Sequence, residues 1–258
     1  MREEFARDFV LPALRAGALC KGRYPVGQAL AWPLIARTLV DIASVERATA
    51  VAHCCTGRDQ ASIGACVAAL DPVIHVMSVG SGNGAQLGHA NLWGWPGAVD
   101  VRRSEAPISP AYVDVAFEQG IPVAINGVRM PLIELIESLS VIAGQHGVGW
   151  IQAGRSETGR PGDHAYEAPA AVVLHAALRA LDAAVLPPDL LRLKQDRAIA
   201  YEHLVSEGLW FTEDREMMDA LNVKTEEKVT GSVRITLFKG MLLTSDVVGV
   251  GQAEVSRA

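Results

Sequence analysis

The first third of the chain alternates between helical and strand-like hydrophobic patterns. Apolar residues recur at helical spacing over residues 3–15 and 28–43, and short buried-strand patterns occupy residues 48–53 and 74–79. Between those two strands, residues 59–70 again show a helical pattern. The order strand, helix, strand predicts a βαβ unit, whose two strands lie parallel in one sheet.

From about residue 109 the pattern becomes that of an antiparallel sheet with long helices. Apolar residues alternate over residues 112–118 and 121–125 on either side of Gln119-Gly120, which predicts a β-hairpin. A strand is predicted at residues 148–152 and a closing hairpin at residues 229–248. The helical patterns of this part lie at residues 131–143, 167–185, 189–207 and 213–221.

These patterns predict an α/β fold of two lobes. Residues 1–85 form a reduced lobe of the nucleotide-binding type, the remnant of a parallel sheet with its helices. Residues 86–258 form an α+β lobe, and the boundary lies near residues 85–110. At roughly 150 residues per domain, a chain of 258 residues has room for this arrangement.

Composition and charge exclude several classes of protein. Half of the residues are hydrophobic and the net charge is −6, so the chain can fill a core but lacks the basic face of a nucleic-acid binder. Mean hydropathy is +0.20, yet no apolar run approaches the ~20 residues of a membrane span. The N-terminus is charged and amphipathic rather than a signal peptide. We expect a cytoplasmic protein with no nucleic-acid or membrane partner.

The four cysteines do not form a metal motif. Cys20, Cys54, Cys55 and Cys66 include no CxxC pair and no histidine at zinc spacing, so no metal site is expected. Small buried thiols are the first interpretation. A nucleophilic thiol beside His53 is the alternative.

Candidate acid–base residues follow the predicted strand 48–53. Chemistry in open α/β folds is placed at the carboxyl ends of strands, so His53 or Asp59 is a candidate general base near Thr56 or Tyr24. His53 is equally interpreted as a structural residue that bonds a neighbouring backbone group. Tyr166 is a candidate hydrogen-bond donor to a substrate oxygen.

A glycine-rich stretch offers a competing interpretation. Gly80-x-Gly82-x-x-Ala85 follows a predicted strand and fits a dinucleotide or S-adenosylmethionine fingerprint. The downstream sequence lacks the βαβ pattern that such a fingerprint requires. A short glycine-rich bridge is therefore the simpler interpretation.

Ordered segments over nearly the whole chain resemble argininosuccinate synthase. The segments are FVLPALRAGA at 9–18, GRYP at 22–25, PLIAR at 33–37, AHCCTGRDQ at 52–60, GIPVAING at 120–127, IAGQHGVG at 142–149, YEAPAA at 166–171, GLWF at 208–211 and VTGSVR at 229–234. The resemblance identifies residues 86–258 as a lobe of the argininosuccinate synthase type. It implies descent rather than activity, because a fold hosts many functions.

The resemblance implies candidate binding residues. The family joins citrulline and aspartate with ATP, and its AHG-x-TGKGNDQ loop is similar to the segment ending in Thr56, Gly57, Asp59 and Gln60. Tyr24 and Tyr166 match citrulline contacts of the family.

Other family features have no match in this sequence. The SGG-type glycine loop that grips phosphate through backbone N–H groups is missing. Ser62 stands where the family has a citrulline-binding arginine, Trp32 replaces another arginine, and the citrulline-binding glutamate position falls near Gly154 or Arg155.

Tryptophans gather in the segments that surround the family's substrate cleft. Trp32, Trp93, Trp95 and Trp150 are four of the five tryptophans, and their rings suit a planar or hydrophobic ligand. The alternative is that they fill space left by missing segments.

Two functions remain open. The first is an enzyme without cofactor that acts on a less polar, possibly aromatic small molecule by proton transfer, in specialised metabolism and as a homo-oligomer. The second is one part of an ATP-dependent ligase whose nucleotide loop lies on a separate subunit. In the first, His53, Asp59 and Tyr166 are catalytic; the predicted substrate-binding residues are Tyr24, Trp32, Thr56, Gly57, Gln60, Trp93, Trp95 and Trp150.

Overall fold

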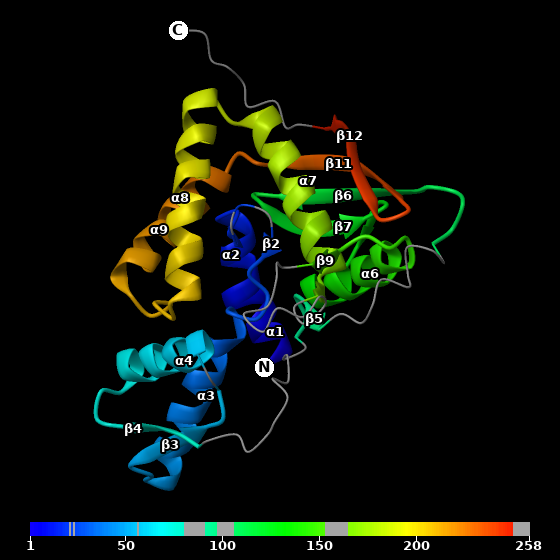
Figure 1. Ribbon diagram of the computed structural model, residues 1–258. Helices are drawn as coiled ribbons and strands as arrows, with labels where there is room; N and C mark the ends of the chain where they lie inside the picture. The colour runs from blue at the N-terminus through cyan, green and yellow to red at the C-terminus, as the bar shows by residue number, and fades with distance from the viewer. Residues whose placement is uncertain are drawn as a thin grey trace, which may run out of the picture.

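The chain folds into a large lobe and a small lobe, with the N-terminal helices against the large one (Figure 1). A computed structural model describes residues 1–20, 22, 24–55, 57–79, 91–96, 106–152 and 165–249. The mixed α/β architecture agrees with the sequence prediction.

The predicted N-terminal helix is present as three consecutive segments. These are α1 (Arg2–Phe5), the π-helical η1 (Ala6–Val10) and α2 (Leu11–Arg15). Phe5, Phe9 and Leu14 are buried in the core of the large lobe, so the apolar spacing did identify the inner face. A short antiparallel pair follows, β1 (Leu19–Cys20) with β2 (Tyr24–Pro25), in a segment between the two predicted helices.

The small lobe contains the predicted βαβ unit. Helix α3 (Ala31–Glu46) leads into β3 (Ala50–His53), α4 (Gly57–Leu70) and β4 (His75–Ser78), and β3 and β4 are parallel with Ala50 opposite His75. Pro33 lies in the first turn of α3, where the missing N–H costs nothing. Helix α3 ends at Arg47, which adopts a left-handed backbone with φ +55°.

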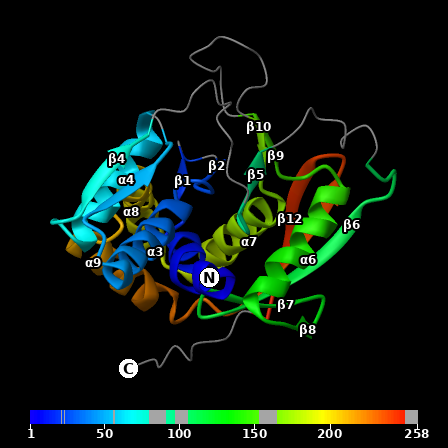
Figure 2. The same ribbon diagram turned by 90° about the horizontal axis from the view of Figure 1, so that it is seen from below.

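The large lobe is built on a five-stranded antiparallel sheet. Its order is β12-β11-β6-β7-β8, and the two predicted hairpins form β6–β7 and β11–β12. Helices α6 and α7 cover one face of the sheet (Figure 2), and Val113, Val115 and Phe117 point into the core between them. The strands are β6 (Ala111–Glu118), β7 (Ile121–Ile125), β8 (Val128–Arg129), β11 (Gly231–Phe238) and β12 (Met241–Val248).

Four helices complete the large lobe: α6 (Leu132–Gln145), α7 (Pro169–Val185), α8 (Pro188–Ser206) and α9 (Glu213–Glu226). Helices α6 and α7 pack on the sheet, whereas α8 and α9 pack against each other and against α7 and α2 respectively. The break between α7 and α8 falls at Leu186 and Pro187, within the gap between the predicted helices 167–185 and 189–207. Helix α9 was predicted to end at residue 221 and extends five residues further. Its last turn buries Asn222, Thr225 and Glu226, which carry no hydrophobic signal.

A three-stranded sheet joins distant parts of the chain. Its order is β5-β10-β9, with β5 (Trp95–Pro96), β10 (Ala165–Glu167) and β9 (Trp150–Gln152). The predicted start of a helix at residue 167 is therefore wrong, because Glu167 pairs with Trp95 and Trp150 and the helix begins at Pro169.

The two lobes meet along α4 and the end of α8. The Ser62 hydroxyl donates to the Ser206 carbonyl at 2.9 Å, and the Cys66 thiol donates to the Gly208 carbonyl at 3.2 Å. Within the described residues, no helix is long and apolar enough to cross a membrane.

Candidate functional site

The turn after β2 connects the N-terminal segment to the three-stranded sheet. The Tyr166 hydroxyl donates a hydrogen bond to the Pro25 carbonyl at 2.6 Å. The Asn91 side chain donates to the Gly27 carbonyl at 2.9 Å and accepts from the Trp93 backbone N–H at 2.8 Å. These bonds hold together three parts of the chain: the turn after β2, strand β10 and the segment that precedes β5.

Asp59, in the first turn of α4, is held by two side chains near the start of α3. The Trp32 indole N–H donates to Asp59 Oδ1 at 3.1 Å, and the Gln28 amide donates to Oδ2 at 3.3 Å. Trp32 itself is 2% exposed and packs in the core of the small lobe. The carboxylate is therefore oriented by its environment, as a positioned acid–base group must be. Gln28 was missed in the sequence, since a glutamine before a helix carries no distinctive signal.

His53 ends β3 and bonds to the backbone. The Cys55 backbone N–H donates to His53 Nδ1 at 3.2 Å, which leaves Nε2 as the protonated nitrogen of a neutral imidazole. This contact favours the interpretation of His53 as a structural residue. A role as general base remains a prediction.

Two tryptophans flank a carboxylate on the three-stranded sheet. Trp95 and Trp150 both lie directly opposite Glu167, one on each neighbouring strand. Residues opposite each other in an antiparallel sheet share a face. The Glu167 carboxylate therefore lies between the Trp95 and Trp150 indoles in one row across the sheet. Glu167 is only 7% exposed, and it was overlooked as a site residue because the sequence placed it at a helix start. Tyr166 belongs to the opposite face of the same strand.

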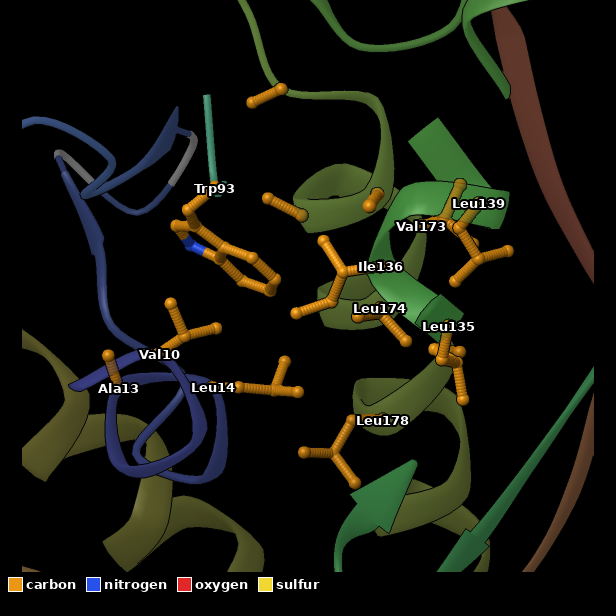
Figure 3. Close-up of a cluster of buried hydrophobic side chains, with 14 of the residues drawn as sticks. Val10, Ala13, Leu14, Trp93, Leu135, Ile136, Leu139, Val173, Leu174 and Leu178 are labelled. Carbon is orange, nitrogen blue, oxygen red and sulfur yellow. The ribbon is translucent and has the colours of Figure 1, made fainter. Parts of the chain in front are cut away.

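The other two of the four predicted site tryptophans lie in separate cores. Trp93 is 1% exposed and packs with Val10, Ile136 and Leu174 in the core of the large lobe (Figure 3). Its ring meets the His175 ring edge-on, with centroids 5.8 Å apart. Trp32 belongs to the core of the small lobe. The structure thus brings Trp95 and Trp150 together and places Trp32 and Trp93 apart from them and from each other.

The structure describes only some of the remaining predicted site residues. Gly57 opens α4 with φ +60°, and Gln60 is exposed on the same helix. Of Tyr24, the structure describes the backbone, which pairs with Cys20. Thr56 lies outside the described residues, as do Gly154, Arg155 and the glycine-rich stretch from Gly80 to Ala85.

The cysteine thiols differ in environment. Cys66 is buried, and burial raises the pKa of its thiol to about 12, so it stays protonated. Burial and the nearby Asp59 raise the pKa of the Cys55 thiol as well, whereas Cys54 is exposed. In the described part of the chain, no three His, Cys, Asp or Glu side chains gather as a metal site.

Replacing Trp32 by phenylalanine should destabilise the small lobe. The change removes the hydrogen bond to Asp59 but keeps an aromatic ring, and a bond to a charged acceptor contributes about 2 kcal/mol to the free energy of unfolding. Urea denaturation measures the loss. Gln28→Ala is the matched control, because it removes the exposed contact to the same carboxylate and should change stability by less than ~0.5 kcal/mol. Equal losses of stability in the two variants would show that the Trp32 contact to Asp59 stabilises the lobe no more than the exposed Gln28 contact does.

Two family models and several known proteins match this chain over most of its length. A family model described as "Arginosuccinate synthase N-terminal HUP domain" matches residues 1–81, and "Arginosuccinate synthase C-terminal domain" matches residues 97–249. The argininosuccinate synthase of Symbiobacterium thermophilum is 38% identical over 283 residues, which covers 93% of this chain and 70% of that protein. That of Oleidesulfovibrio alaskensis is 36% identical over 299 residues, covering 98% and 73%.

Proposed function

Because this chain belongs to the argininosuccinate synthase family, we propose that it keeps the two-lobe frame of the family and binds a less polar small molecule without using ATP. The observation that carries the proposal is the row of Trp95, Glu167 and Trp150. Two indoles on one face of the sheet suit a planar, less polar ligand.

Proton transfer is the chemistry that these side chains support. Carboxylates and imidazoles take and return protons, and Asp59 is already oriented by Trp32 and Gln28. In an isomerisation, cyclisation or elimination, one group takes a proton from the substrate and another returns one. Such a reaction consumes no nucleotide. Tyr166, whose hydroxyl is bonded to the Pro25 carbonyl, would hold the turn after β2 against the opposite face of the sheet.

A second function is favoured by one observation on the small lobe. Strand β3 has β4 on one side and no other strand beside it among the described residues, and the helices α3 and α4 cover one face of the pair. On the other face Ala52 and Met77 are exposed, Met77 to 51%. Parallel sheets are normally covered on both faces. A further αβ segment, in the same or another polypeptide, would complete the lobe as part of an ATP-dependent ligase of citrulline and aspartate.

Calorimetric titration with Mg-ATP separates the two functions. The ATP-independent function predicts no binding heat at millimolar Mg-ATP, alone or with citrulline and aspartate present. Micromolar binding would contradict it and support the ligase component. Adenosine serves as the control ligand, because it tests whether any binding depends on the phosphates.

A further inference from the structure

A lysine is buried between two carboxylates where three helices of the large lobe meet. Lys194 on α8 is 4% exposed, and its ammonium donates to Asp182 Oδ2 on α7 at 2.5 Å and to Glu226 Oε1 on α9. Asp182 and Glu226 are themselves 3% and 0% exposed. This cluster lies apart from the candidate site described above and shares none of its residues.

The two carboxyl groups have more acceptor oxygens than the lysine serves. Asp182 Oδ1 and Glu226 Oε2 are both buried, and neither accepts a hydrogen bond from a donor group. The two carboxyl groups also interact with each other. Two carboxylates that share a buried site favour binding of one proton, since the protonated group then becomes a donor.

The turn between β6 and β7 packs directly against the Glu226 side chain of this cluster. A Cβ added at Gly120 would lie 2.3 Å from Glu226 Oε2, so the glycine backbone packs against the unpaired oxygen. The Gly120 N–H donates to the Val229 carbonyl at 2.9 Å, just after α9. The turn therefore shields Glu226 from water.

Among the described residues, Arg15 is a second cation that acts on Glu226. It reaches the cluster from α2 and donates to the Gln119 carbonyl at 2.8 Å. Arg15 is also attracted to Asp219 on α9, which in turn is bonded to Arg215 and to the Tyr201 hydroxyl. The β6–β7 turn contributes backbone groups to this contact, and Lys194 and Asp182 are the charged groups from α8 and α7.

We propose that Lys194, Asp182 and Glu226 hold one proton and act as a pH-sensitive latch that fastens α7, α8 and α9 beneath the β6–β7 turn. With the proton bound, the cluster has one ammonium, one carboxylate and one carboxylic acid. Loss of that proton leaves an unsatisfied anion under the turn, and the turn opens to admit water.

The direction of the pH effect follows from the environment of Glu226. Burial, together with the charge of Asp182, raises the pKa of Glu226 from 4.5 to about 7, although Lys194 and Arg15 act in the opposite direction. A carboxyl whose pKa is raised on folding stabilises the native state fully below its unfolded pKa. That contribution is lost as the pH rises from about 4.5 through about 7. Burial lowers the pKa of the neighbouring His175 to about 3, so it stays neutral throughout this range.

Urea unfolding of the full chain at about pH 5.5 and pH 8.5 tests the latch. The unfolding equilibrium constant of the wild type should rise about thirtyfold between the two conditions, because Glu226 is mostly ionised at both pH values in the unfolded chain but only at the higher pH in the native state. Glu226→Gln keeps the shape of the protonated group, so it should abolish most of that rise and exceed the wild type in stability at the higher pH. Glu118→Gln is the control, because this exposed residue of the same hairpin should leave the wild-type pH dependence unchanged. An unchanged pH dependence in Glu226→Gln overturns the proposal.

Infrared spectroscopy of the wild type provides a test that does not depend on a variant's folding. The carbonyl stretch of a buried protonated carboxylic acid should be present at the lower pH and disappear at the higher pH. Amide hydrogen exchange at Gly120 should show the accompanying opening of the turn. Absence of the carboxylic acid band at both pH values would also overturn the proposal.

Discussion

Gly149→Ala is expected to destabilise the large lobe by about 4 kcal/mol or more, because two costs add. Gly149 has φ +93°, a conformation that side chains rarely adopt, and an added Cβ would lie 2.3 Å from the Pro169 Cα. The three nearest atoms, Pro169 Cα, Pro169 N and the Ala168 carbonyl carbon, all belong to the backbone at the start of α7, where the Ala168 N–H donates to the Gly149 carbonyl at 2.8 Å. No side chain can rotate away to relieve the overlap.

Thermal unfolding followed by circular dichroism measures this loss. Gly127→Ala is the matched control, since Gly127 also has a positive φ, +79°, but nothing within 4 Å of an added Cβ. That variant should lose only about 1 kcal/mol through backbone strain. Similar losses in both variants would show that the close approach to Pro169 does not matter. Gly149 immediately precedes Trp150, so the same contact sets where this indole lies beside Glu167.

Lys194→Met is expected to lower the free energy of unfolding by about 3–5 kcal/mol at neutral pH. Methionine fills much of the volume of lysine but leaves Asp182 and Glu226 buried without their shared cation. The loss should shrink at low pH, where protonation neutralises both carboxyl groups. Urea denaturation over a range of pH measures both effects.

Lys224→Met controls for the removal of a lysine from the same region. Lys224 is exposed and pairs with Glu227 at the surface, and exposed pairs contribute less than about 1 kcal/mol. If Lys194→Met lowered the free energy of unfolding as little as Lys224→Met does, the buried cluster would not be a major source of stability.

The order of elements could be predicted well wherever hydrophobic periodicity was strong. Alternation over residues 112–125 predicted the β6–β7 hairpin, and the apolar stripe of residues 131–143 predicted most of α6. The last turn of α9 was missed because its buried face is polar and ends in Glu226. Burial there depends on Lys194, which comes from a different helix.

The sequence proposed Asp59 and Tyr166 as candidate site residues, but it missed Gln28 and Glu167 and did not predict how the residues are arranged. It did not predict that the Trp32 indole donates to Asp59 or that the Tyr166 hydroxyl donates to the Pro25 carbonyl. The tryptophans were expected to share one pocket. Only Trp95 and Trp150 share a strand register, and Trp93 packs in the large core.

The sequence by itself determined the local elements and the family, because helical and strand periodicity and ordered segments are properties of neighbouring residues. Tertiary structure alone decided which distant residues meet. Glu167 became a candidate site residue only when β5 and β9 paired on either side of it, and Lys194 gained two carboxylates only when three helices packed together. Such contacts depend on strand register and helix packing across long sequence separations, which no local pattern encodes.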